Sequence, residues 1–122
     1  GCTIHARSAA GVLARLEQLA AMANPPMSSD GVRKSLVEAM PIIVHLAYEE
    51  DEHGVARRYC TSIVEVNGME GGNVSQTELW GLNDRNELVP HEALSSAPRK
   101  KLRPWGWDWE SDGWAHHLEG KR

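Results

Sequence analysis

Hydrophobic residues near the start of the chain recur at the three- to four-residue spacing of a helix. The first such stretch covers residues 9–23, with charged and polar side chains off the apolar stripe. Ser8 stands where an N-cap is needed, and Asn24-Pro25-Pro26 ends the stretch because proline cannot continue the hydrogen-bond ladder. The stripe consists of Val12, Leu16, Leu19 and Ala23.

A second helix is predicted from the serines at 28 and 29 to about residue 40, with Asp30 as a further possible N-cap. Its apolar stripe consists of Val32, Leu36 and either Met40 or Ala39. Ahead of both helices, residues 1–6 contain the β-branched Thr3 and Ile4, which favour the end of a buried strand. Because the chain enters this strand without a polar lead, we expect a segment cut from a longer protein.

After residue 41 the pattern changes to that of strands. Residues 42–48 form an apolar run, residues 49–54 form an acidic turn that ends in glycine, and residues 55–66 are rich in Val, Ile, Thr and Tyr. Further turns are predicted at Asn67-Gly68 and at 71–73, before a third strand over 74–82. The sequence therefore predicts two helices followed by a three-stranded antiparallel meander.

Regular patterning stops after residue 82. We therefore divide the chain into a folded part, 1–82, and an irregular Pro- and Trp-rich extension, 83–122. The extension contains a basic cluster at 99–103 and then a run of tryptophans. An extended backbone would place Trp105, Trp107 and Trp109 on one face. This face is predicted to cover the chain's own domain or, as the second choice, a partner, because Trp is favoured at interface hot spots.

Composition narrows the class of protein. The 122 residues allow one domain, and 41% hydrophobic with 25% charged residues argues against disorder. The formal charge of -4 argues against a general polyanion binder, so no nucleic acid is expected as a partner. Cys2 and Cys60 lie far apart and form no C-x-x-C pair, which favours a reducing, cytosolic setting.

Several short motifs occur in a fixed order along the first part of the chain. They are Thr3-Ile4-His5-Ala6-Arg7-Ser8, Arg15-Leu16-Glu17, Ile42-Ile43-Val44-His45-Leu46, Arg57-Arg58 and the run from Ile63 to Gly71. Taken together, residues 1–82 resemble the C-terminal half of the type II/IV secretion ATPases, closest to those that assemble Tad (Flp) pili. In that family the first motif is the His box, usually T-I-H-A-N-S. Arg7 departs from the family's asparagine, and Pro41 stands where aspartate is frequent.

The resemblance implies an α/β fold, namely the C-terminal fragment of a RecA-like P-loop ATPase domain. It implies a parent protein that binds ATP and Mg²⁺, forms a homo-oligomer, in this family a hexamer, and powers pilus assembly or secretion. The partners implied are the missing N-terminal half of the ATPase and inner-membrane platform proteins. The implied location is cytoplasmic, peripheral to the inner face of the cell membrane.

Catalysis by this chain alone is excluded on chemical grounds. Phosphoryl transfer needs a loop that cradles the phosphates and an acidic residue that holds the metal, and the chain has neither G-x-x-x-x-G-K-[ST] nor a Walker-B carboxylate. His5 is the strongest candidate for a functional role. From the residues alone, a histidine bonded to neighbouring backbone is the commoner outcome. The resemblance instead implies that His5 senses the γ-phosphate and that Arg15 also contacts the nucleotide.

The remaining polar candidates have simpler interpretations. Glu17 is expected to be structural. Arg57 and Arg58 are expected to be an exposed hairpin pair with at most one facing a neighbouring subunit, and His45 to lie in the core or on a sheet face. A zinc site made by Cys2, His5, Cys60 and a tail histidine lacks the paired spacing of structural zinc sites.

Two other functions stay open. The chain is alternatively a free-standing protein-interaction module that has lost its nucleotide-binding half and uses the Trp tail and the edge of the meander. A weaker alternative is a nucleic-acid binder that uses residues 99–109, where the basic cluster at 99–103 lies beside the tryptophans. An open reading frame that starts just before Gly1 would favour the interaction module, and one that runs hundreds of residues upstream would favour the motor ATPase. An unpaired strand edge also predicts self-association of the isolated chain.

Overall fold

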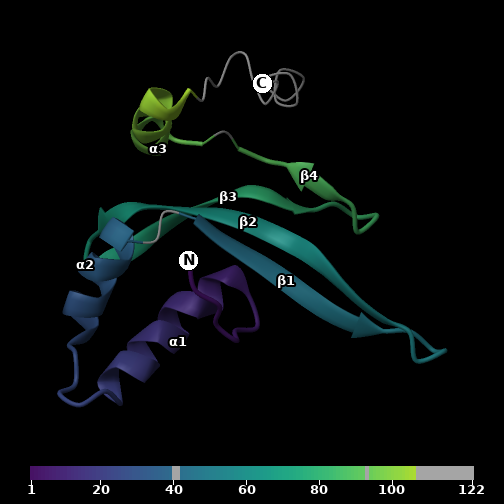
Figure 1. Ribbon diagram of the computed structural model, residues 1–122, viewed down its shortest axis with the longest axis horizontal. Coiled ribbons are helices and arrows are strands. Elements are labelled where there is room, and N and C mark those ends of the chain that lie inside the picture. The colour runs from purple at the N-terminus through teal and green to yellow at the C-terminus, as the bar shows by residue number, and fades with distance from the viewer. Residues whose placement is uncertain (40–41, 93, 107–122) are drawn as a thin grey trace.

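The computed structural model describes residues 1–39, 42–92 and 94–106 and is mixed α/β (Figure 1). Within these residues a four-stranded antiparallel sheet has the order β1-β2-β3-β4, with α1 and α2 on one face and α3 on the other (Figure 1). The elements are α1 (Ala9–Ala21), α2 (Ser29–Ala39), β1 (Ile42–Glu50), β2 (Ala56–Glu70), β3 (Asn73–Leu82), β4 (Leu88–Pro90), α3 (Ser96–Leu102) and the 3-10 helix η1 (Arg103–Trp105).

Serine caps start both long helices, as the sequence predicts. The Ser8 hydroxyl accepts a hydrogen bond from the Gly11 N–H at 3.1 Å, and the Ser28 hydroxyl accepts one from the Gly31 N–H at the same distance. Each bond satisfies a first-turn donor that has no partner inside the helix. Helix α1 ends at Ala21, two residues before the predicted end and ahead of the paired prolines.

The apolar stripes of α1 and α2 form the core with the lower face of the sheet. Val12 and Ala9 of α1 pack with Ile43, Val64 and Val66 of β1 and β2. A second cluster joins the two helices to each other and consists of Leu13, Val32 and Leu36. Burial of these side chains is therefore what holds both helices on this face.

An ion pair between Glu17 of α1 and Arg33 of α2 links the two helices at the edge of this layer. The Arg33 guanidinium donates to the Glu17 carboxylate and, at 2.9 Å, to the carbonyl oxygen of Gly72 in the β2–β3 turn. The Glu17 carboxylate, by this hydrogen bond and then by its charge, raises the pKa of Arg33 above its usual value. The structural role predicted for Glu17 is confirmed, because it links α1 to α2 and, through Arg33, to the sheet.

Three tight turns set the register of the sheet. Gly71 and Gly72 both have positive φ (56° and 84°) and join β2 to β3, the geometry of a two-residue hairpin that disfavours side chains. Asp51 and Asn83 begin the other two turns, and each side chain accepts two backbone N–H groups further along its loop. The hairpin predicted after residue 41 and the third strand are confirmed.

Two predictions about the sheet are wrong. Residues 1–6 form no strand, because a strand needs a neighbour for its ladder and β1 pairs only with β2 within the described chain. Asn67-Gly68 is no turn either. It lies inside β2, where a bulge between Val66 and Gly68 takes up the extra residue.

The region after residue 82 is more regular than predicted. The Asn83 turn folds β4 back onto β3, so the antiparallel sheet has a fourth strand. Pro90 is tolerated there because β4 is an edge strand in the described sheet. Trp105 lies in η1 and is followed by Gly106 in the left-handed region, so its backbone is not extended as the Trp ladder requires. Trp107 and Trp109 lie outside the described residues.

Candidate functional site

An open groove of about 1200 Å³ runs beside β1. The N-terminal segment, residues 1–7, forms one wall, and residues 42–48 of β1 form the other. The remaining lining residues are Val12, Ala39 and Arg58. The groove therefore lies between the segment that carries His5 and the outer edge of the sheet.

The edge strand β1 gives this groove an exposed apolar wall. Side chains of a strand alternate between faces, so Ile43 enters the core while its neighbours point to the other face. Three of these outward side chains are largely exposed, namely Val44 (55%), Leu46 (60%) and Tyr48 (58%). A long edge strand with an exposed apolar row is a template for another chain segment.

His5 is exposed and lines the groove. No hydrogen bond or ion pair holds its imidazole within the part of the chain that the structure describes. The alternative in which neighbouring backbone satisfies this histidine therefore finds no support. Both ring nitrogens are free to meet a ligand or a second protein surface that enters the groove.

His45 is half-buried and, unlike His5, has hydrogen-bond partners. Its Nδ1 lies 2.5 Å from the Thr61 hydroxyl and its Nε2 lies 3.4 Å from the carbonyl oxygen of Ala6. The Ala6 carbonyl can only accept, so Nε2 must carry a proton to make this hydrogen bond. The Thr61 hydroxyl also donates to the His45 carbonyl oxygen at 3.3 Å. The sheet-face role predicted for His45 is confirmed, and the residue also ties the N-terminal segment to the sheet.

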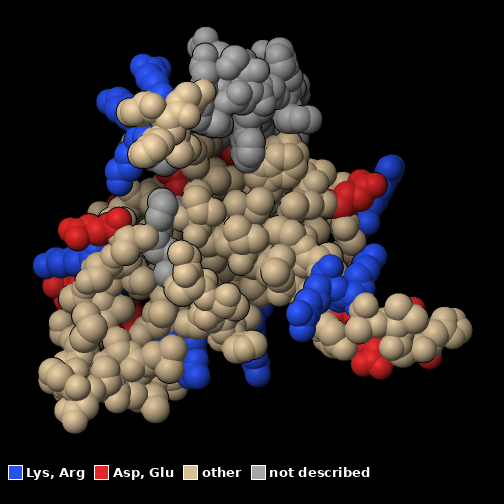
Figure 2. Space-filling model, viewed as in Figure 1, with Lys and Arg blue, Asp and Glu red and all other residues tan. Residues whose placement is uncertain are grey.

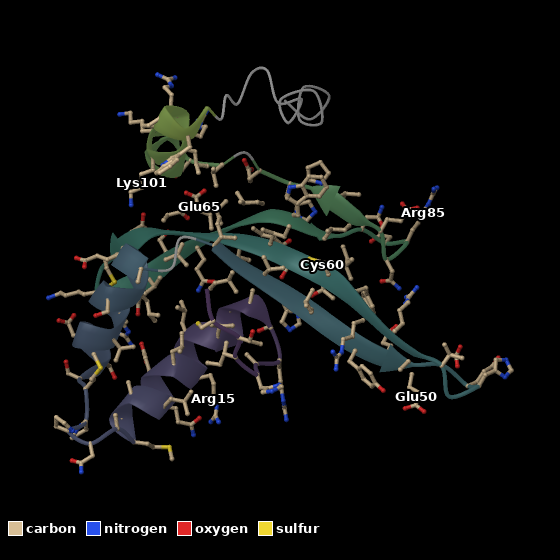
Figure 3. All side chains as sticks on the ribbon, viewed as in Figure 1. Arg15, Glu50, Cys60, Glu65, Arg85 and Lys101 are labelled. Carbon is tan, nitrogen blue, oxygen red and sulfur yellow. The ribbon has the colours of Figure 1, made fainter. Side chains whose placement is uncertain are left out.

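Arg15 lies outside the groove. It is exposed on α1, and its guanidinium donates to the Gln18 side chain at 2.7 Å. Figure 3 shows Arg15 on the side of α1 that faces away from the sheet. The structure therefore does not bring the two candidate nucleotide-binding residues, His5 and Arg15, to one place.

The charged side chains along the groove are all cationic. Arg7 and Arg58 belong to its lining, and no carboxylate does among the described lining residues. The Arg58 guanidinium also lies over the ring of Tyr48, 5.9 Å from the ring centroid, which is at the outer limit for a cation–π contact. This donor set suits an anionic group such as a phosphate, and it offers no carboxylate oxygen to Mg²⁺, which prefers such ligands.

The exposed arginine pair on β2 matches its prediction. Arg57 lies 3.8 Å from the Glu49 carboxylate and over the ring of Tyr59. The Tyr59 hydroxyl donates to Glu49 at 2.6 Å, and this hydrogen bond is the main cause that raises the pKa of Tyr59 above its usual value. These contacts stabilise the outer end of the β1–β2 ribbon and do not form part of the groove.

Sequence reasoning missed the role of Glu65. This carboxylate is the most buried charged side chain described, 1% exposed, and it lies on the α3 face of β2 (Figure 3). The Ser95 N–H donates to its Oε2 at 2.9 Å, and the Ser95 hydroxyl donates to its Oε1. Its position within the apolar run Ile63–Val66 was the one available signal, because a carboxylate there must find donors.

No metal centre is assembled by the described ranges. Within them no three His, Cys, Asp or Glu side chains gather as metal ligands. Cys2 is exposed and Cys60 is half-buried, with its thiol directed at the Ser62 carbonyl at 3.6 Å, and the two are not joined. Of the histidines in the extension, His91 pairs with Glu78 at 2.9 Å, and His116 and His117 lie outside the described residues.

Among the helices formed by the described residues, none combines the length and the hydrophobicity of a membrane span. No family model matches the chain, and no curated protein matches it at a significant level.

Proposed function

We propose that the chain is the C-terminal portion of a RecA-like motor ATPase of the type II/IV secretion class, closest to those that assemble Tad pili. In this proposal it contributes His5 to an ATP site whose phosphate loop and metal-holding acid belong to the N-terminal half. The observation that carries the proposal is the exposed, unpartnered His5 in a cationic groove beside the open edge of β1.

The positions of the motifs support this assignment. The His-box segment runs directly into the N-cap of α1, and Arg15-Leu16-Glu17 lies in the middle of that helix. Residues 42–46 begin the edge strand, and the Ile63–Gly71 run ends in the β2–β3 turn. The resemblance predicts a strand at residues 42–46, a hairpin around residues 57–58 and a turn within residues 63–71. The first two match β1 and the β1–β2 hairpin, whereas the third stretch lies in β2 as far as Glu70 and only Gly71 reaches the turn.

The open edge of β1 supports the idea that a second half completes the fold. Residues 42–48 expose a strand edge, and the apolar row Val44, Leu46 and Tyr48 lies uncovered within the described structure. Unpaired edges of this length are normally covered in a finished protein. The N-terminal half of the ATPase is the occupant that the resemblance supplies, and it would extend the sheet on this side.

The chemistry of His5 follows from its exposure. An imidazole N–H that enters the groove can donate to a terminal phosphate oxygen or hold the attacking water, and so distinguish ATP from ADP. Bound Mg²⁺ would neutralise charge on the transferring phosphoryl group, and its ligands must come from the other half, because the described groove lining has no carboxylate. Arg7 and Arg58 add positive charge along the same groove.

Other features of the proposal rest on the resemblance alone. These are the contact of Arg15 with nucleotide, the hexameric ring, the inner-membrane platform partners and the peripheral cytoplasmic location. Arg15 would need to act from outside the groove, since it bonds Gln18 on the far side of α1.

The decisive experiment tests His5 in the protein encoded by the longer reading frame. We expect His5→Ala to lower ATPase turnover by about a hundredfold, the usual cost of losing one donor to the transition state. His53→Ala is the matched control, because His53 is exposed in the β1–β2 turn and pairs only with Glu52 in the described structure. Unchanged turnover in His5→Ala would remove the role of His5.

A binding measurement on the 122-residue chain tests the division of labour between the two halves. Calorimetry should find no micromolar affinity for Mg-ATP, because the phosphate-binding loop is absent from this sequence. Micromolar binding by this chain would contradict the proposal that the N-terminal half supplies that loop.

The exposed apolar row on β1 also favours a second candidate, a protein-interaction module that docks a partner strand on this edge. The two candidates differ in what precedes Gly1. A reading frame that encodes a P-loop upstream supports the motor, and one that starts just before Gly1 supports the module.

A further inference from the structure

Helix α3 and η1 carry a concentrated positive charge on the face of the sheet opposite α1 and α2. Lys100, Lys101 and Arg103 are exposed there, beside Arg99. In Figure 2 the Lys and Arg side chains fan out around α3 at one end of the molecule. This charge contrasts with the formal charge of -4 for the whole chain.

Apolar side chains adjoin these cations. Trp105 is 87% exposed and Leu102 is 39% exposed. We call Lys100, Lys101, Leu102, Arg103 and Trp105 together the basic–Trp patch. Water-exposed Trp is energetically unfavourable unless a surface covers it, and within the described residues nothing covers Trp105.

We propose that the basic–Trp patch docks on an anionic lipid surface. Lysine and arginine near such a surface are attracted by its negative potential, and tryptophan settles at the level of the headgroups. Leucine beside it adds apolar area that enters the boundary of the acyl chains. The inference goes beyond the ATPase assignment and rests on the patch alone.

The shape and composition of the patch favour a membrane over nucleic acid. Single-stranded nucleic acid needs a groove with successive aromatic side chains on which bases stack. Within residues 94–106 the patch offers one aromatic side chain, Trp105, and it lies around a short helix at the end of the molecule (Figure 1). Such a tip meets a flat surface more readily than it wraps a strand.

Hydrogen bonds also attach the start of α3, and with it the basic–Trp patch, to the sheet. Ser95, just ahead of α3, donates twice to the buried Glu65 carboxylate. Arg99 donates from Nε to the Ser95 carbonyl at 3.2 Å, which secures the base of the helix. The cations therefore project from a fixed base, so binding costs less conformational entropy than it would for a free tail.

Vesicle cosedimentation of the full 122-residue chain tests the proposal. Vesicles of phosphatidylcholine mixed with phosphatidylglycerol should bind the chain at low salt, and vesicles of phosphatidylcholine alone should not. Lys100→Glu with Lys101→Glu should lower the partition coefficient by about twentyfold or more, because each basic residue strengthens binding by about fivefold. Added salt should weaken the binding of the unchanged chain.

Matched variants distinguish the effect of the basic–Trp patch from the effects of net charge and of losing any exposed aromatic ring. Arg57→Glu with Arg58→Glu makes the same change in net charge on the β1–β2 ribbon and should leave binding within about twofold, because surface charges beyond a Debye length are screened. Trp105→Ala should weaken binding, whereas Tyr48→Ala, which removes another exposed aromatic ring, should not.

Four results would overturn the proposal. One is equal binding to neutral and anionic vesicles, and another is equal loss in the two double variants. The third is tighter binding to a single-stranded oligonucleotide than to anionic vesicles at the same salt, which would assign the patch to nucleic acid. Absence of vesicle binding at low salt has the same consequence as the first two.

Discussion

The two faces of the sheet hold their helices by different means. On one face, α1 and α2 bury apolar side chains in two hydrophobic clusters, one against β1 and β2 and one between the two helices. On the other face, α3 is tied through Ser95 to one buried carboxylate, Glu65, while the β1 row at Val44, Leu46 and Tyr48 stays exposed. The face that carries α1 and α2 provides most of the apolar burial, and the face that carries α3 leaves the β1 row exposed for a partner.

This difference has an energetic consequence. Apolar burial is non-directional and is spread over many side chains, so α1 and α2 unfold together with the sheet. A polar anchor depends on a few donors, so its loss can release one element and leave the rest folded. Substitutions on the two faces should therefore differ in the size of their effect and in how far it spreads.

The largest expected effect is on the helix-packed face. Leu13→Ala removes a buried side chain from the α1–α2 cluster and should lower the free energy of unfolding by roughly 2–4 kcal/mol, because it creates a cavity. Leu19→Ala on the same helix is the control. Leu19 is 41% exposed, so its loss should cost less than about 1 kcal/mol. Urea unfolding measures both, and equal losses would contradict the placement of the core.

The second effect is on the polar anchor. Glu65→Ala leaves the Ser95 N–H without its acceptor and should lower the free energy of unfolding by about 1–3 kcal/mol. The sharper readout is local, because backbone amides of α3 should exchange faster while those of α1 keep their protection. Glu70→Ala, at the exposed end of the same strand, should change neither quantity. Uniform loss of protection in both helices would mean that the two faces are not independent.

These two faces also differ in how well the sequence predicts them. The helices α1 and α2 follow from stripes such as Val12 and Leu36 and from the serine caps, which are local signals. The Glu65–Ser95 contact joins residues separated by 30 positions, and no local pattern encodes such a pair. Strand β4 was missed for a related reason, since a three-residue strand that ends in Pro90 has no alternation to detect.

The candidate site was predictable only in part. The motif order singled out His5, and its position on an exposed groove could be expected once the segment was placed before α1. The strand predicted for residues 1–6 failed because its ladder depends on a neighbour that this chain does not provide in the described residues. Arg15 was grouped with His5 by resemblance, whereas its position on α1 directs it to Gln18.

The smallest expected effect lies at the end of the β1–β2 ribbon, which neither set of helices covers (Figure 1). The Tyr59 hydroxyl donates to the Glu49 carboxylate, and this bond raises the pKa of Tyr59 above its usual value in the folded chain. A raised pKa means that folding favours the protonated phenol. Its contribution to stability is therefore full below the unfolded pKa and is lost as pH rises through the folded pKa.

Two tyrosines in the chain allow a direct measurement of this effect. Tyr48→Phe leaves Tyr59 as the one phenol, and its ultraviolet titration should fall above the ordinary value of about 10. Adding Glu49→Gln should return the titration toward that value, because the charged acceptor is gone. As pH rises through this range, the urea midpoint of unfolding should fall less in Tyr59→Phe than in the unchanged chain. If Glu49→Gln left the pKa of Tyr59 unchanged, the hydrogen bond to Glu49 would not be the cause of the raised pKa.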